Sequence, residues 1–582
     1  MRQNLRLLTI LMLFATHSFS QAPMFKWAKA MAGNQPALGY SIVTDNNGNV
    51  YTAGVFSGTV DFNPGPGTFY LTAGNSRSGF VSKLDSNGQF LWAKSIISSC
   101  FFTCSGTYGI ATDNLGNAYV TGAFSETTDF DPGSGAHILP RDEGGPFVLK
   151  LGPAGNFLWV RSFKGVYPFA SHGYAITADA AGNTYTTGMF GQTVDFDPGP
   201  GVYMLESNGP TPDAFVVKLD ASGNFVWAKK TGTTRLELPY AICLDNHGNL
   251  YTTGRFGGSG YSPDPNFTAL GFSFPAEHDS VFVWKMDNSG NTQWTKFFRN
   301  DSSSESKDVF VDADGHIYTT GRFYGTIDFD PGPATYNLTS LGVADVFISK
   351  LDANGNFVWV KRLPSSPTWS YIWSNSESLV VDKAGNIYLI GTLAGYLDFD
   401  PGNGINMLTA SGYWDIFLLK LDASGNFLWA SQIGNTGYDY GLDLAIDQKN
   451  NIYATGGFSG TVDFDPGAAV FNMTTPLSAM GMYALKLKDT TSIQWPVSPC
   501  RISEATKIYP NPCSRSLFIN KERTTCTVTM NVYDILGRRV VRNKLLQDGL
   551  NELPVFGLPA GTYFYEFISG GGTLLTGKFV KS

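Results

Sequence analysis

An internal repeat that returns seven times is the feature that most constrains how this chain can fold. Each copy contains an Asp that opens a turn, a Lys in a strand-like segment and, in six copies, a closing Trp. Corresponding landmarks lie 65 to 70 residues apart, with the lysines at Lys83, Lys150, Lys218, Lys285, Lys350, Lys420 and Lys486. A fixed period of this kind indicates repeated structural units rather than one irregular globule.

Each repeat contains four short segments typical of β-strands. In the third repeat they are 174–178, 184–190, 215–219 and 225–230, and D-x-x-G-N turns join the first pair and the last pair. Asp and Gly suit such turns, because Asp accepts backbone N–H bonds and Gly adopts a positive φ. Regular four-stranded units predict an all-β fold, and we expect a seven-bladed β-propeller over residues 24–495.

The ring of such a propeller needs a strand that joins its two ends. The segment around Trp27 precedes the first full repeat and can supply the outer strand of the last blade. Trp495 is the alternative, but Pro496 follows it and weakens a strand there. We therefore favour the Trp27 segment.

Residues 1–20 have the layout of a signal peptide. Arg2 and Arg6 precede the apolar run 7–15, and Ser18 and Ser20 are small residues before an expected cleavage site at Gln21. The apolar run is too short to span a bilayer, and no later segment is long enough. The sequence predicts an exported protein without a transmembrane segment.

The repeat stops after residue 495. Residues 496–506 are expected to be a linker, and 507–582 contain short alternating segments divided by Gly and Pro. This pattern is typical of a small Ig-like β-sandwich.

Two family resemblances follow from these motifs. The D-x-x-G-N-x-Y-x-x-G, D-F-D-P-G and K-L-D-x-x-G-x-x-x-W pieces resemble the SBBP-type repeats of secreted bacterial propellers. The ordered Y-P-N-P, Y-D-x-x-G-R, L-x-A-G-x-Y and G-K-F-V-K pieces of 507–582 resemble the type A C-terminal sorting domain of the type IX secretion system. The second resemblance implies a type IX secretion partner, removal of the domain, and release or attachment at the cell surface.

The D-F-D-P-G motif places two carboxylates on one side of a strand in five repeats, and a D-F-N-P-G variant occurs at 61–65. Six equal copies argue against catalysis, which needs one asymmetric arrangement. Asx-Pro-Gly fits a tight turn, and we favour that structural role, with the repeated Lys as a candidate partner of the first Asp. Calcium is the alternative ligand for these acids: Asp61, Asp129, Asp195, Asp197, Asp328, Asp330, Asp398, Asp400, Asp463 and Asp465.

The composition indicates the compartment of the protein and argues against nucleic acid as a partner. Charged residues make up 15% of the chain and the formal net charge is −8, without the basic stripe of nucleic-acid binding proteins. The six cysteines fit an oxidising compartment but do not form a disulfide framework. Cys100 and Cys104 are close enough in sequence for a disulfide, and the pairing of Cys500, Cys513 and Cys526 stays open.

Candidate ligand residues lie where the repetition fails. Trp369, Tyr371 and Trp373 occupy a long connection outside the repeat pattern, and loop aromatic residues can stack on sugars or anchor a protein. They can equally fold onto the propeller. Four residues before the Asp of the first D-x-x-G-N turn, most repeats have a small residue, whereas two repeats have Asp308 and Asp443. We expect these two acids to line a central channel.

These features predict a secreted or cell-surface protein that binds a glycan or a protein. A propeller-fold glycan hydrolase or lyase is one alternative, for which Asp308, Asp443 and His278 are the only hints. A purely structural surface protein is the other. We favour a non-enzymatic role and expect no cofactor other than calcium.

Overall fold

A computed structural model describes residues 22–74, 77–98, 106–165, 171–233, 235–257, 279–365, 374–476, 479–489, 507–509, 512–521, 528–534, 539–547, 549–569 and 572–582. The chain divides into two compact units, Met1–Thr490 and Thr491–Ser582. Among the described residues, β-strands are interrupted by a single helical turn, η1 (Arg141–Glu143). In the same residues, no helix has the length and apolar character needed to cross a membrane.

The N-terminal unit consists of four-stranded antiparallel ladders, numbered here in chain order. The first is β2 (Ala37–Thr44), β3 (Val50–Phe56), β6 (Ser78–Leu84) and β7 (Phe90–Ser98). The second is β8 (Gly106–Thr112), β9 (Ala118–Phe124), β12 (Gly145–Leu151) and β13 (Phe157–Ser162). The third is β15 (His172–Ala178), β16 (Thr184–Phe190), β19 (Asp213–Leu219) and β20 (Phe225–Thr231).

The remaining ladders repeat this order. The fourth is β21 (Glu237–Leu244), β22 (Leu250–Phe256), β23 (Ser280–Met286) and β24 (Thr292–Asn300). The fifth is β25 (Ser304–Val311), β26 (Ile317–Phe323), β29 (Asp345–Leu351) and β30 (Phe357–Leu363). The sixth is β31 (Asn375–Val381), β32 (Ile387–Leu393), β35 (Asp415–Leu421) and β36 (Phe427–Ile433). The seventh is β37 (Tyr440–Ile446), β38 (Asn451–Phe458), β41 (Gly481–Lys488) and β1 (Met24–Gly33).

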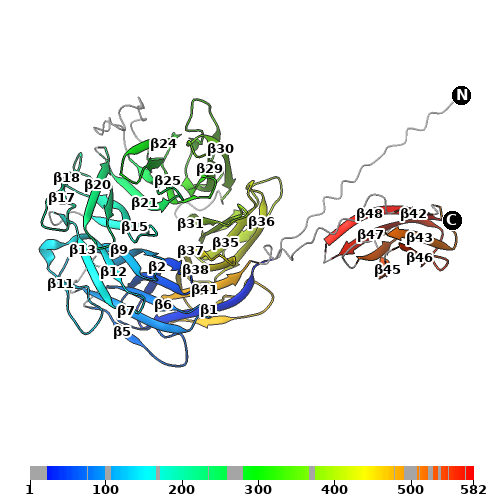
Figure 1. Ribbon diagram of the computed structural model, residues 1–582, viewed down its shortest axis with the longest axis horizontal. Coiled ribbons are helices and arrows are strands. Elements are labelled where there is room, and N and C mark those ends of the chain that lie inside the picture. Colours follow the sequence, from blue (N-terminus) through cyan, green and yellow to red (C-terminus); the bar gives the residue numbers. More distant parts are fainter. Residues whose placement is uncertain are drawn as a thin grey trace. The chain divides into compact units, whose positions relative to one another are not determined.

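The ladders surround a common centre in a propeller-like ring. Figure 1 shows the first strands β2, β15, β21, β25, β31 and β37 nearest the centre. Each of these strands contacts the first strand of the next ladder, and β37 contacts β2. The ring is joined by β1, whose Trp27 pairs with Lys486 of β41. This pairing confirms the expected role of the Trp27 segment, whereas Trp495 lies outside the described residues.

The D-x-x-G-N segments form the expected hairpin turns. In the third ladder the N–H of Gly182 donates to the carbonyl of Asp179, and Gly182 has a φ of +82°. The seventh repeat has Asn450 in place of this Gly, with a φ of +56°. Asn is one of the few residues with a side chain that tolerates this conformation.

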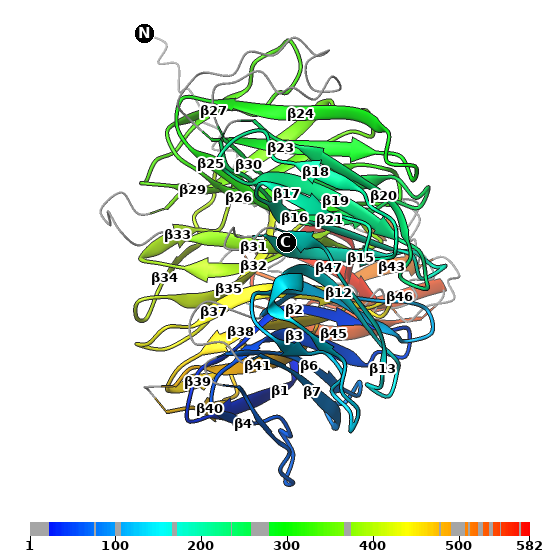
Figure 2. The ribbon, with the colours of Figure 1, turned by 90° about the vertical axis from the view of Figure 1, so that its left-hand side faces the viewer.

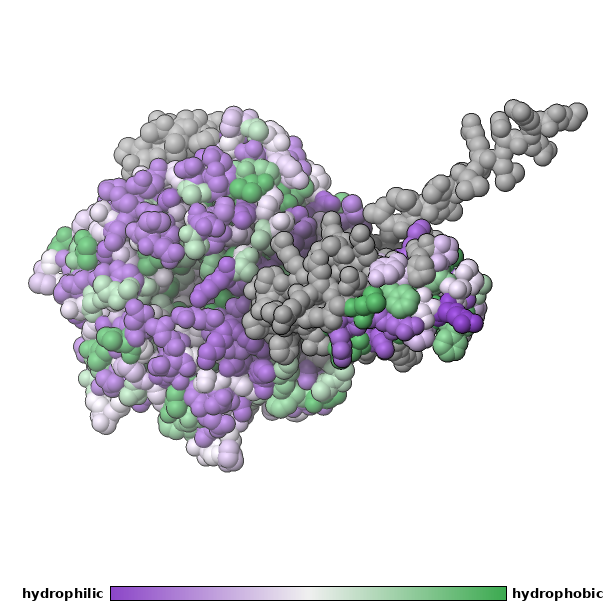
Figure 3. Space-filling model, turned by 45° about the vertical axis from the view of Figure 1, so that its right-hand side comes forward, coloured by the Kyte–Doolittle hydropathy of each residue, from purple (hydrophilic) through white to green (hydrophobic). Residues whose placement is uncertain are grey.

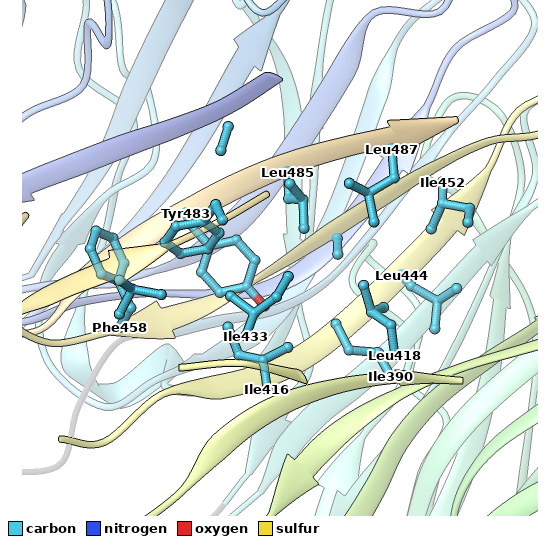
Figure 4. Close-up of a cluster of buried hydrophobic side chains, with 14 of the residues drawn as sticks. Ile390, Ile416, Leu418, Ile433, Leu444, Ile452, Phe458, Tyr483, Leu485 and Leu487 are labelled. Carbon is cyan, nitrogen blue, oxygen red and sulfur yellow. The ribbon is translucent and has the colours of Figure 1, made fainter. Parts of the chain in front are cut away.

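The hydrophobic core lies between neighbouring ladders. Strands such as β3, β9 and β16 are buried along their whole length, because each ladder is covered on both faces. Figure 4 shows the cluster between the sixth and seventh ladders, which includes Ile390, Ile416, Leu418, Ile433, Leu444, Ile452, Phe458, Tyr483, Leu485 and Leu487.

A short hairpin lies in the connection between the second and third strands of six ladders. These hairpins are β4 (Thr59–Asp61) with β5 (Tyr70–Thr72), β10 (Thr128–Asp129) with β11 (Ile138–Leu139), β17 (Thr193–Asp195) with β18 (Met204–Glu206), β27 (Thr326–Asp328) with β28 (Asn337–Thr339), β33 (Tyr396–Asp398) with β34 (Met407–Thr409), and β39 (Thr461–Asp463) with β40 (Asn472–Thr474). Figure 1 shows β5, β11, β17 and β18 at the outer rim, and Figure 2 shows β33, β34, β39 and β40 from the side.

These rim hairpins extend the sheet of the preceding ladder. β4 pairs with β1, β10 with β7, and β27 with β24, which are outer strands of the ladders before their own. β17 pairs with β14 (Lys164–Gly165), which directly follows the second ladder. In these four repeats the long connection therefore ties adjacent ladders together with backbone hydrogen bonds, and it covers an outer sheet edge.

The D-F-D-P-G residues form the turn of each rim hairpin. In the third ladder, Oδ1 of Asp195 accepts the backbone N–H groups of Asp197 and Tyr203, at 3.0 and 2.8 Å. Oδ1 of Asp197 accepts the N–H of Gly199 at 2.8 Å, and Phe196 is fully buried. The same bonds of the first Asp recur in the other five copies.

The expected pairing of this first Asp with the repeated Lys is wrong. Lys83 lies 3.8 Å from Asp45, in the D-x-x-G-N turn, and not beside Asp61. The reason is topological: Lys83 lies near the end of β6 that meets the D-x-x-G-N turn, whereas the rim hairpin leaves the opposite end of the ladder.

In several repeats the Lys and the Trp instead join one ladder to the next. Lys83 Nζ and Trp92 Nε1 both donate to the carbonyl of Pro153, in the second ladder, at 3.1 and 3.0 Å. Equivalent Lys bonds run from Lys150 to Ala221, Lys218 to Asn288, Lys285 to Ala353 and Lys486 to Ser86. Between the sixth and seventh ladders, Lys420 instead forms a buried ion pair with Asp489 at 2.7 Å.

The C-terminal unit contains two antiparallel sheets. One has β42 (Lys507–Tyr509), β43 (Ser516–Lys521) and β46 (Gly549–Pro554) in that order. The other has β45 (Arg539–Leu546), β44 (Val528–Tyr533), β47 (Gly561–Ser569) and β48 (Gly572–Lys581). Buried residues from both sheets, such as Leu517, Val532 and Phe567, form one core. Cys513 lies in that core, while Cys500 and Cys526 are outside the described residues.

The hydrogen bonds of Asp195 predict a graded response to substitution. We expect Asp195→Ala to lower the free energy of unfolding by about 1–3 kcal/mol, since two backbone N–H groups lose their acceptor. Asp195→Asn keeps one acceptor oxygen and should cost less. Asp197→Asn is the matched control and should be nearly neutral, because Asn63 fills this position in the first copy. Denaturant unfolding checks the series, and an Asp195→Ala protein as stable as the control would contradict this role.

The same bonds predict the response to a chelator. Protein N–H groups already occupy Oδ1 of the first Asp in all six turns, so these turns form without a cation. We expect the melting temperature of the full chain to be unchanged in EDTA. A fall in EDTA that added calcium reverses would instead support the calcium alternative for these acids.

Candidate functional site

A β-bulge occurs at the same place in each of the seven first strands. The register slips by one residue, for example between Gly39 and Ser41 of β2. The residue left unpaired is Tyr40, Tyr108, Tyr174, Tyr240, Lys307, Glu377 or Leu442 in chain order. A bulge redirects a side chain, and these seven residues, called here the bulge ring, all line one axial cavity.

The axial cavity has a volume of about 670 Å³ and is bounded by the first strands of all seven ladders. This volume is within the range of small-molecule sites. Besides the bulge ring, it is lined by the residues that follow it, among them Ser41, Asp308, Ser378 and Asp443. The cavity therefore combines aromatic, aliphatic and charged side chains in one place.

Four tyrosines of the bulge ring form an arc across consecutive ladders. The ring centroids of Tyr40, Tyr108, Tyr174 and Tyr240 are separated by 5.6, 6.3 and 5.9 Å along the arc. His172 stacks on Tyr174 with an interplanar angle of 6°. Burial raises the pKa of Tyr108, Tyr174 and Tyr240, so these three residues are neutral phenols.

A charged network holds one end of this arc. Lys307 lies 4.0 Å from the ring centroid of Tyr240 and 3.2 Å from Oε1 of Glu305. Glu305 also forms an ion pair with Arg322 Nη2 at 2.7 Å and accepts a hydrogen bond from the Tyr240 hydroxyl at 3.3 Å. Burial alone would raise the pKa of Glu305, but Lys307 and Arg322 bring it below its usual value. Glu305 is therefore a carboxylate that fixes both Lys307 and Tyr240.

The structure places Asp308 and Asp443 in the axial cavity, as the sequence predicts. Oδ2 of Asp308 accepts the Ser378 hydroxyl and the Leu379 N–H, at 2.9 and 2.8 Å. Oδ2 of Asp443 accepts the N–H of Ile42 at 2.8 Å. Burial raises the pKa of Asp308 to about 7 and that of Asp443 to about 6. In the described part of the chain, neither carboxylate has a cationic partner within ion-pair distance.

Other predicted site residues lie outside the described residues or at the rim. Trp369, Tyr371 and Trp373 lie outside the described residues, as do Cys100, Cys104 and His278. The acids of the D-F-D-P-G turns lie at the rim rather than in the axial cavity.

One further cluster of possible metal ligands comprises Asp312, Asp314 and His316 in the turn after β25. Both carboxylate oxygens of Asp312 already have partners: Oδ1 accepts two backbone N–H groups, and Oδ2 lies 3.0 Å from both His316 Nδ1 and the Tyr318 hydroxyl. This is the turn network of the other ladders, with His316 in place of the usual Asn.

Sequence reasoning missed the tyrosine arc. Aligning the repeats draws attention to the position after the bulge, because Asp308 and Asp443 occur there among small residues. The signal one residue earlier was present, since four consecutive repeats have Tyr and the next three have Lys, Glu and Leu. It could not be interpreted without the bulge, because ordinary alternation places adjacent residues on opposite faces of a strand.

Comparison with known families identifies the C-terminal unit. Residues 507–582 match the secretion system C-terminal sorting domain. This match indicates export through type IX secretion machinery, followed by release or attachment at the outer surface. The matched residues lie within the second unit.

The chain also has a distant curated relative. An uncharacterized WD repeat-containing protein of Acanthamoeba polyphaga mimivirus is 25% identical over 511 residues, covering 74% of this chain. The chain spans 36% of the length of that relative.

Solved structures with propeller-like folds are also similar at low identity. U3-55K is 9% identical with a TM-score of 0.39, and the match covers 80% of this chain and 99% of that one. Sqt1 from Chaetomium thermophilum is 11% identical with a TM-score of 0.32, covering 66% and 96%.

The buried acids predict how stability depends on pH. The folded-state pKa values of Asp308 (about 7) and Asp443 (about 6) lie above the unfolded value of 3.8. The folded protein therefore binds more protons than the unfolded chain between about pH 4 and 7, and its stability falls as pH rises through this range. We expect the melting temperature to be about 2–5 °C lower at pH 8 than at pH 5. Asp308→Asn should reduce this difference, and an unchanged pH profile in that variant would contradict the assignment.

Proposed function

We propose that the chain is an exported binding protein, built as a seven-bladed β-propeller of the SBBP-repeat type with an Ig-like C-terminal sorting domain. The signal peptide of residues 1–20 would direct the first export step. The C-terminal domain, joined through a linker at 496–506, would direct passage through the type IX machinery. The mature propeller then acts outside the cell or on its surface.

The tyrosine arc in the axial cavity is the observation that carries the binding role. Tyr108 and Tyr174 are partly exposed and line a cavity of about 670 Å³. Aromatic faces held by a rigid scaffold gain contact area on binding with little loss of conformational entropy. This arrangement suits a small ligand or a protruding side chain of a larger glycan or protein.

Binding explains the cavity better than catalysis does. The oxygens of Asp308 and Asp443 accept backbone hydrogen bonds from their own strands and from neighbouring ladders, and Asp308 also accepts the Ser378 hydroxyl. These bonds orient both groups but leave less freedom for proton transfer. Trp369, Tyr371 and Trp373 belong to this proposal as a second contact surface on the connection between the fifth and sixth blades.

A glycan and peptide array tests the binding role. We expect the full chain to retain a subset of probes, and Tyr108→Ala or Tyr174→Ala to weaken retention by about tenfold or more, because each removes one aromatic face. Tyr70→Ala is the matched control, since Tyr70 is an exposed tyrosine of the rim hairpin β4–β5. If the arc variants retain the probes as strongly as the Tyr70→Ala control does, the ligand binds elsewhere on the chain. If the full chain retains none of the probes, the binding role is refuted.

A further inference from the structure

The charged side chains that line the axial cavity are unequal in number. Three are acidic, Asp308, Glu377 and Asp443, and one is basic, Lys307. The cavity also lies at the centre of a ring in which the other lining groups are neutral. Its lining therefore has an excess of negative charge whenever the acids are ionised.

The single lining cation is already engaged. Lys307 is 3.2 Å from Glu305, and its side chain is only 17% exposed. Its ammonium also lies over the face of Tyr240. Lys307 is therefore held by a carboxylate and an aromatic face on the Tyr240 side of the cavity.

Asp308 and Asp443 face the cavity from ladders on either side of Ser378. Their hydrogen bonds come from backbone N–H groups and from Ser378, which are neutral donors. Burial is the main cause of the raised pKa of both groups, and repulsion from Asp443 raises the pKa of Asp308 further. A positive charge between them would relieve this repulsion and replace the water that ionised carboxylates lose on burial.

The tyrosine arc provides the second half of a cation site. Aromatic faces attract cations, and Lys307 over Tyr240 shows this contact within the protein itself. Tyr40, Tyr108 and Tyr174 continue the same arc, and all three line the same cavity as the two carboxylates. Arg77 Nη2 reaches the arc from its other end, where it donates to the Tyr40 hydroxyl at 3.2 Å.

We propose that the axial cavity binds an organic cation, a primary ammonium or guanidinium on a short aliphatic stem, between the tyrosine arc and the Asp308–Asp443 pair. The charged head faces the carboxylates, and the stem lies against the aromatic rings. A lysine or arginine side chain of a partner protein and a free aliphatic amine share this chemistry. This inference rests on the proposed binding function and adds the class of ligand.

Calorimetric titration of the full chain with matched probes tests the inference. Nα-acetyl-lysine amide carries the cation, and Nα-acetyl-norleucine amide has the same stem without it. We expect the lysine probe to bind at least tenfold more tightly. Cadaverine separates the two sources, because a free amine that binds as tightly as the lysine probe indicates a small-molecule ligand, and weaker binding indicates a side chain of a partner.

Variants locate the binding energy. Asp443→Asn should reduce the affinity for the lysine probe about tenfold, while Asp220→Asn makes the same change on an exposed turn outside the cavity and should have no effect. Tyr174→Ala should weaken both the lysine and norleucine probes, since it removes contact with the stem.

Two results would overturn the proposal. Equal affinity for the lysine and norleucine probes, including no binding of either at millimolar concentration, shows that the cavity does not select a cation. This comparison needs no variant, so it remains decisive if Asp443→Asn fails to fold. A neutral glycan that binds the array and is lost in Tyr174→Ala, without lysine binding, would refute the ligand class and leave the proposed binding function intact.

Discussion

Pairing between strands from opposite ends of the N-terminal unit is the constraint on which the ring depends. β1 begins at Met24 and pairs along its length with β41, which ends at Lys488. Without this pairing, β41 would be an edge strand, and the seventh ladder would have three strands instead of four. Because open edges invite pairing with other chains, the closing strand protects the unit as well as completing it. The entropic cost of joining such distant segments grows only slowly with loop length.

Contacts between neighbouring ladders hold the rest of the ring together. In several repeats the Lys and the Trp tie one end of a ladder to a turn of the next, as Lys83 and Trp92 do at Pro153. The rim hairpins extend the sheet of the preceding ladder at the outer edge, as β4 does at β1. Burial lowers the pKa of Lys83, but its bonds to the next ladder and its position over Tyr51 compensate for part of that cost. The rim hairpin is thus a second link between ladders, besides the Lys and Trp bonds. A shorter connection could not form it, which explains the length of the repeat.

The sequence predicted the repeated parts well and the irregular parts poorly, for a physical reason. The turns, the strand order and the closing role of Trp27 follow from local patterns that recur along the chain. A chance match in one copy therefore does not change the interpretation of the whole repeat. The partner of Asp61 could not be found this way, because Lys83 and Asp61 belong to the same repeat but to opposite ends of a ladder. The bulge that brings Tyr40 and Ser41 to one cavity was hidden as well, since a register slip depends on how β2 pairs with β3.

The bulge ring also shows how a repeated fold can acquire one site. Seven equal residues at the centre of a ring would give a symmetric lining with no preferred orientation for an asymmetric ligand. Here the first four positions are Tyr, and the next two, Lys307 and Glu377, are charged. The backbone therefore repeats while the side chains divide the cavity into an aromatic side and a polar side. Since the bulges fix where each side chain projects, changes at these positions alter the chemistry of the cavity without altering the ladders that hold it.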